Sequence, residues 1–90
     1  MTEQEYKVLQ AWCKSAFNKK HYPNKYKEMV SIRNKATQIR RNIILCREYI
    51  KDAMFVLEAS KTPEAIAKWK GIVLTHQECK RGWMEQFKNL

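Results

Sequence analysis

Three arginines at a spacing of seven residues are the strongest candidates for binding chemistry in this sequence. They are Arg33, Arg40 and Arg47. A helix places every seventh residue on nearly the same side, about 10.5 Å further along its axis. The planar guanidinium group of arginine forms paired hydrogen bonds with phosphate or carboxylate. The row therefore predicts a positively charged stripe along one helix, which is typical of nucleic-acid binding.

The positive charge of the chain is concentrated in the same segment. Between Tyr6 and Arg47 there are eleven Lys or Arg residues and one acid, Glu28, so this segment carries +10 within a chain whose net charge is +9. Two tyrosines lie among these cations, as stacking on nucleobases requires. We expect an anionic partner, either nucleic acid or an acidic protein. The residues expected to contact it are Lys19, Lys20, Lys25, Lys27, Arg33, Lys35, Arg40, Arg41, Arg47, Tyr22 and Tyr26.

A second interpretation of these charges and aromatic residues is structural. Glu78 and Glu85 are also seven residues apart, so they could pair with Arg40 and Arg33 across two neighbouring helices. The tyrosines would then close the end of a helical bundle. Pairing of this kind accounts for part of the positive charge and leaves the rest in solvent.

The sequence contains no constellation that is typical of catalysis. His76 and Cys79 stand at i and i+3, which suits a metal or a nucleophile pair, but no second His/Cys pair accompanies them. Glu48 and Asp52 share a helix face beside cations and resemble a solvated charged surface. There is no glycine-rich phosphate loop. We expect a protein that is not an enzyme and that binds no metal and no cofactor.

The hydrophobic pattern predicts the helices that must position these residues. From Asn24 to Ser60 the chain has no Gly or Pro, and apolar residues recur at alternating spacings of three and four. They are Met29, Ile32, Ala36, Ile39, Ile43, Cys46, Ile50, Ala53 and Leu57. This pattern predicts one long central helix over about 24–59, with room for a bend near 31–34.

Two start signals flank the central helix. Thr2 and Glu5 match a capping box, which predicts a helix over about 3–19. Thr62 followed by Pro63 predicts the start of a helix over 63–88. We therefore expect an all-α fold, a single domain over 1–90, in the form of an antiparallel three-helix bundle. Gly71 and Gly82 stand beside large residues and favour close helix packing.

The lengths of the predicted helices indicate self-association. The three helices overlap best around residues 30–45 of the central helix, whereas residues 43–57 are apolar almost all round. A monomer would leave part of this surface without cover, which is typical of an interface. We expect a homodimer formed through Ile44, Leu45, Phe55 and Val56. The alternative is that the central helix breaks and folds back on itself.

The remaining expectations concern location and function class. An odd number of cysteines, three, does not suit a disulfide framework and favours a reducing compartment. No apolar run is long enough to cross a membrane, and no secretory signal is visible, so we expect a cytoplasmic protein without membrane association. The leading hypothesis is a non-enzymatic basic helical protein that binds nucleic acid through phosphate contacts. The alternatives are a regulator or inhibitor of the phage or mobile-element accessory type that docks on an acidic protein, and a nucleotide-binding oligomer.

Overall fold

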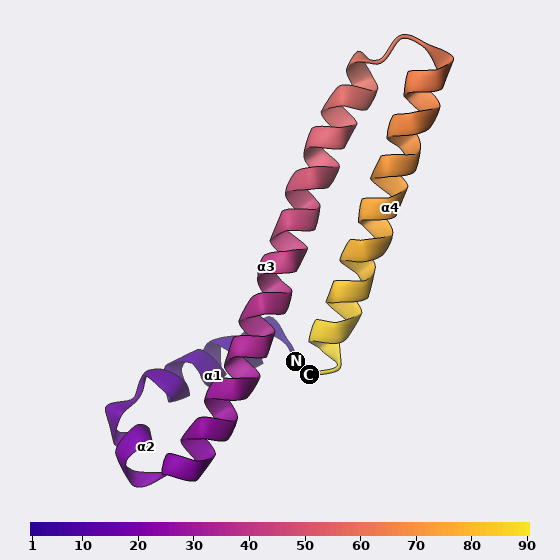
Figure 1. Cartoon of the computed structure of the whole chain (residues 1–90). Helices are drawn as coiled ribbons and strands as arrows, with labels where there is room; N and C mark the ends of the chain where they lie inside the picture. Colours follow the sequence, from indigo (N-terminus) through magenta and orange to yellow (C-terminus); the bar gives the residue numbers. More distant parts are fainter.

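The computed structural model describes all 90 residues and contains four helices and no strand. They are α1 (Glu3–Lys14), α2 (Ala16–His21), α3 (Pro23–Ala59) and α4 (Pro63–Lys88), as Figure 1 shows. The all-α fold and the long central helix are confirmed. Because α3 runs for 37 residues without interruption, the alternative of a broken central helix is wrong.

The predicted start signals of α1 and α4 are both present. The Oγ1 atom of Thr2 accepts a hydrogen bond from the backbone N–H of Glu5, and the Glu5 carboxylate accepts one from the N–H of Thr2. The Oγ1 atom of Thr62 accepts from the N–H of Ala65 at 3.2 Å, and Pro63 occupies the first position of α4. These bonds satisfy backbone donors that a helix start leaves unpaired.

The helix expected over residues 3–19 is in fact two helices that meet at Ser15. Ser15 has an extended backbone (φ −74°, ψ 117°), and its Oγ atom accepts a hydrogen bond from the N–H of Asn18 at 3.3 Å. The Asn18 side chain in turn donates to the carbonyl of Trp12 at 3.1 Å. Serine and asparagine thus satisfy the ends of both helices in place of helical hydrogen bonds, and the chain turns here.

The molecule is elongated, because only α3 runs along most of its length. α4 packs antiparallel against the C-terminal part of α3, and α1 and α2 lie against the N-terminal part (Figure 1). The chain measures 63 × 19 × 17 Å, and its radius of gyration is 18.7 Å, against about 12 Å for a compact chain of this length. Its accessible surface is 6947 Å², where about 5500 Å² is usual for its mass.

The main core lies where three helices meet. Tyr6 of α1 and Phe87 of α4 pack together with Ala36, Ile39 and Ile43 of α3, within the stretch where the overlap was expected. The rings of Tyr6 and Phe87 meet edge to face, with centroids 6.1 Å apart.

The two glycines of α4 lie away from the other helices. No atom lies within 4 Å of the Cβ position of either Gly71 or Gly82, so the expected close approach of helices at these glycines is wrong. No helix is both long enough and apolar enough to cross a membrane.

Candidate nucleic-acid interface

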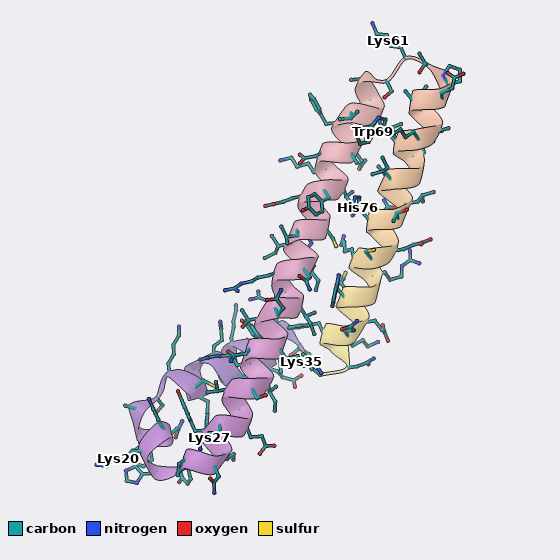
Figure 2. The ribbon with its side chains drawn as sticks, viewed as in Figure 1. Lys20, Lys27, Lys35, Lys61, Trp69 and His76 are labelled. Atoms are coloured by element: carbon teal, nitrogen blue, oxygen red, sulfur yellow. The ribbon has the colours of Figure 1, made fainter.

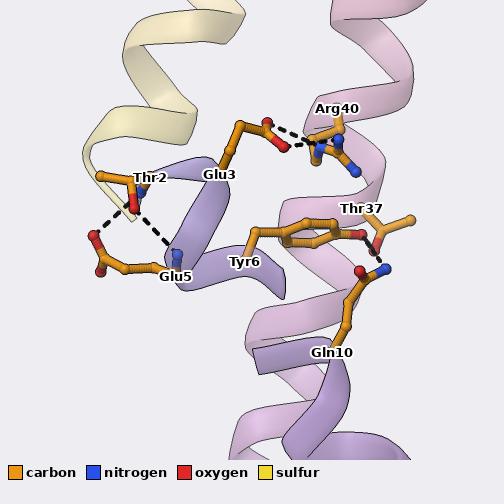
Figure 3. A network of polar contacts seen from close by, with 7 residues as sticks. All are labelled: Thr2, Glu3, Glu5, Tyr6, Gln10, Thr37 and Arg40. Atoms are coloured by element: carbon orange, nitrogen blue, oxygen red, sulfur yellow. Dashed lines mark hydrogen bonds and ion pairs between the residues drawn. The ribbon is translucent and has the colours of Figure 1, made fainter. Parts of the chain in front are cut away.

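A polar network fixes α1 across the middle of α3 (Figure 3). The Tyr6 hydroxyl shares a 2.6 Å hydrogen bond with Oγ1 of Thr37 and accepts another from Nε2 of Gln10 at 3.1 Å. Tyr6 is only 2% exposed, so its ring belongs to the core while its hydroxyl reaches the edge of the network. The position of α1 therefore depends on both packing and hydrogen bonds.

Arg40, the middle member of the arginine row, is held by α1. Its Nε and Nη2 atoms donate to the two carboxylate oxygens of Glu3 at 3.2 and 2.9 Å. Its guanidinium group also lies over the Tyr6 ring, 4.4 Å from the centroid. The alternative interpretation, in which Arg40 pairs with Glu78 of α4, is wrong, because α1 crosses α3 here and brings Glu3 within reach.

The other two arginines of the row have no acidic partner. Arg33 donates to the side-chain oxygen of Asn34 at 3.1 Å, and Arg47 is exposed without a hydrogen bond. The Arg40–Glu3 pair is the only salt bridge in the molecule. The alternative pairing of Arg33 with Glu85 is therefore wrong as well, and nearly all of the positive charge faces solvent.

Most of the remaining predicted contact residues surround the end of the molecule formed by α2 and the start of α3, whereas Lys35 and Arg41 lie further along α3. Figure 2 shows Lys20 and Lys27 at this end and Lys35 further along α3. The exposed cations of the predicted set are Lys19, Lys20, Lys25, Lys27, Lys35, Arg41 and Arg47. The charge is thus spread over α2 and the first part of α3.

The two tyrosines differ in their environment. Tyr26 is half-buried and stacks on Trp12, with centroids 6.4 Å apart. Lys19 approaches the Tyr26 ring at 5.9 Å, and Lys25 approaches the Trp12 ring at 6.0 Å. Tyr22 is exposed and touches Phe17 at the edge of its ring. Tyr26 thus closes the end of the bundle, while about half of the Tyr22 surface is exposed.

The predicted cations do not form one flat face. At about 100° per residue, the three arginines of the row fall within a sector of about 40° around α3. Around the axis of α3, Arg41 lies about 100° and Lys27 about 140° from Arg40, the middle of the row. Lys35 lies about 140° from Arg40 in the opposite direction. The positive charge therefore wraps around the N-terminal half of α3, as suits contact with a flexible or curved anion more than with a single pocket.

A shallow groove runs beside the arginine row. Its volume is about 350 Å³, and it is open to solvent. Its charged lining residues are Glu3, Arg40 and Arg47, and its apolar ones are Met1, Ile43, Ile44, Met84 and Phe87. Because Glu3 already occupies Arg40, Arg47 is the cation of this groove that remains available.

The pair His76 and Cys79 has a packing environment. His76 lies on the ring of Tyr49 across the α3–α4 contact, with centroids 5.3 Å apart, and Cys79 is exposed. No group of three or more His, Cys, Asp or Glu side chains is gathered anywhere in the molecule.

The four residues expected at a self-association surface are all exposed, by 36% to 74% of their area. They lie on two sides of α3. Ile44 and Phe55, eleven residues apart, share one side, whereas Leu45 and Val56 lie about 100° away. The sequence interpretation missed Tyr49, Met54 and Leu74, which are equally exposed. Their signal was present, since each is a large apolar residue outside the regular seam.

Comparison with models of protein families, with curated proteins and with solved structures finds no match to this chain.

Proposed function

We propose that this chain is a non-enzymatic helical protein that binds nucleic acid through its phosphates. One observation carries the proposal: residues 6–47 have a charge of +10, and the molecule contains a single salt bridge. A surface that leaves so many cations unpaired gains free energy when it displaces the counterions of a polyanion. The contact surface comprises α2, the N-terminal half of α3 and the arginine row.

The shape of this surface supports contacts to the backbone over contacts to base edges. Arg33 and Arg47 lie about 21 Å apart along α3, so the row spans several successive phosphates. The cations wrap around a helix that also carries α1 and α2. Phosphate contacts fix position and carry no sequence information. We therefore expect weak sequence preference, with Tyr22 able to stack on an unpaired base.

The proposal includes a cytoplasmic homodimer. Ile44, Leu45, Phe55 and Val56 expose apolar surface that a monomer leaves in water. All three cysteines are free, which suits a reducing compartment.

Binding to random-sequence duplex DNA and to single-stranded RNA tests the proposal. Fluorescence anisotropy from ~50 to ~200 mM salt should show binding to at least one of them, with affinity that falls steeply and linearly on a log–log plot. Changing the sequence of the probe should alter the affinity by less than about tenfold.

Absence of binding to either probe at ~50 mM salt would overturn the proposal and favour an acidic protein as partner. A pull-down from lysate with and without nuclease separates these outcomes directly. A partner that disappears on nuclease treatment is held through nucleic acid, whereas one that remains is bound by the protein itself.

A further inference from the structure

A second regular row of residues runs along α3 on the side away from α4. We call it the outer stripe; its members follow each other at spacings of three and four, and they are Arg41, Ile44, Glu48, Lys51, Phe55 and Glu58. They fall within a sector of about 100°, whose centre is about 150° from that of the residues facing α4. All six are exposed, and none takes part in a salt bridge. The stripe has the spacing of a coiled-coil seam. Its edge borders two shallow grooves that reach α4, one lined by Ile44 and Met84 and the other by Phe55 and Lys80.

The outer stripe is complementary to itself in one orientation. If a second copy of α3 lies antiparallel, with the two-fold axis between Tyr49 and Ile50, three kinds of layer form, each twice. Arg41 lies opposite Glu58 of the second copy, and Glu48 lies opposite its Lys51. Ile44 lies opposite Phe55 of that copy. A two-fold interface requires this relation, in which residue i meets j and j meets i.

Other arrangements of the same stripe are unfavourable. A parallel pairing places each charged residue opposite its own copy, so that like charges meet at four of the six positions. An antiparallel pairing shifted by one heptad places Arg41 against Lys51 in one direction, and Glu48 against Glu58 in the other. Like charges placed directly opposite each other destabilise a pairing. The stripe therefore specifies orientation and register together.

We propose that this protein forms an antiparallel dimer through the outer stripe in this register. The inference rests on the self-association proposed above and adds the arrangement. The charge distribution favours it, because residues 48–90 carry seven cations and six acids and can approach a copy without strong repulsion. The basic halves repel each other, and this register places the N-terminal ends of the two α3 helices about 80 Å apart.

The arrangement gives the dimer two nucleic-acid surfaces at opposite ends. If the nucleic-acid proposal holds, one dimer can contact two duplexes, or two distant sites on one molecule, at the same time. Its further role would be to bridge nucleic acids. The contact seam is about 27 Å long, which places the interface at the small end of specific interfaces and predicts dimers that dissociate on dilution.

A charge exchange tests the register. Sedimentation equilibrium should show a concentration-dependent dimer for the wild type. Glu48→Lys and Lys51→Glu should each weaken dimerisation by about tenfold, because each places like charges opposite each other twice per dimer. The double variant Glu48→Lys/Lys51→Glu should restore the wild-type dimer to within about threefold, since opposite charges face each other again.

A matched pair of apolar variants tests the face. Phe55→Asp in the outer stripe should give a monomer, whereas Leu74→Asp, on the outer side of α4, should leave the dimer unchanged. Both residues are exposed, by 74% and 58% respectively, so neither change should unfold the chain, and circular dichroism checks that the helices persist. Capture of a labelled duplex by a bead-bound duplex then reports bridging, which Phe55→Asp should abolish while duplex binding remains.

The outcomes separate the proposals. A wild-type protein that stays monomeric at tens of micromolar overturns the dimer altogether. A dimer that ignores both single charge changes, or that Leu74→Asp breaks, uses another face and overturns the register alone. A dimer that follows the charge exchange but captures no second duplex supports the interface. If it still binds single duplexes, the result counts against bridging. If it binds no duplex at all, the result counts against nucleic-acid binding.

Discussion

The two ends of this molecule differ in how many helices pack against α3. At the N-terminal end, α1 crosses α3 and joins α4 around a core that contains Tyr6, Ile39 and Phe87. Beyond the reach of α1, only α4 lies against α3, and the buried residues are small: Cys46, Ala53 and Val73. The first end is strongly basic, whereas the second is nearly neutral.

This difference indicates a division of function. Two helices in contact shield one stripe on each, and the other sides of both remain in water. Three helices can enclose a core, and therefore the α3–α4 end gains most from an additional helix. Because this end lacks most of the charge that opposes association, self-association can centre on the C-terminal half of α3 and anion binding on the N-terminal half, with Arg41 and Arg47 where the two surfaces meet.

The largest contrast is expected from truncating an aromatic residue in each half. Tyr6→Ala should lower the free energy of unfolding by about 3–5 kcal/mol, because it leaves a cavity in the three-helix core. Phe55→Ala should cost the monomer less than about 0.5 kcal/mol, since this ring is exposed in the chain alone. Urea denaturation of both variants, at a concentration where the protein is monomeric, measures the two values. Equal costs would show that the two halves are not packed differently.

The sequence predicted the elements that local signals define and missed those that depend on how helices cross. The end of α3 and the bounds of α4 were predicted correctly because caps, prolines and an unbroken apolar period mark them. The break at Ser15 was missed because apolar residues continue at Phe17, so the period alone shows no interruption.

The partner of Arg40 was missed for a different reason. Glu3 belongs to a helix start, and the sequence gives no measure of the angle at which α1 crosses α3. Since that angle decides which acid reaches the guanidinium group, no local signal could have identified the pair. Exposure of Ile44 and Phe55, by contrast, followed from helix lengths alone.

The second contrast concerns binding. Changing Arg33 and Arg47 together to Gln should weaken duplex binding by about tenfold or more at ~150 mM salt and reduce the log–log salt slope by about 2, because two phosphate contacts are lost. The matched variant, Lys68→Gln with Lys70→Gln in α4, removes the same charge from the neutral half. Its slope should stay within about 0.5 of the wild type. Equal slopes for the two variants would mean that net charge alone, and not the basic half, drives binding.

The third contrast uses the same substitution at two helix starts. Thr62→Ala removes the cap of α4 and should lower the free energy of global unfolding by about 1 kcal/mol, since α4 packs along half of α3. Thr2→Ala removes one bond of the capping box of α1 and should act mainly on local opening of that short helix. Hydrogen exchange resolves the two cases. Faster exchange confined to α1 is expected in Thr2→Ala, whereas an equal loss of global unfolding free energy in both variants would contradict the separation of the halves.

The smallest expected effect is a gain in stability at a glycine of α4. Gly71 is exposed within the helix, and nothing lies within 4 Å of the position that a Cβ would take. Gly71→Ala should therefore stabilise the chain by about 0.5–1 kcal/mol, because alanine loses less backbone entropy on entering a helix and meets no neighbour. The midpoint of thermal unfolding should rise by a few degrees. A lower midpoint would indicate that another surface packs against α4 at this glycine. The second copy of the chain would then contact α4 and not the outer stripe of α3.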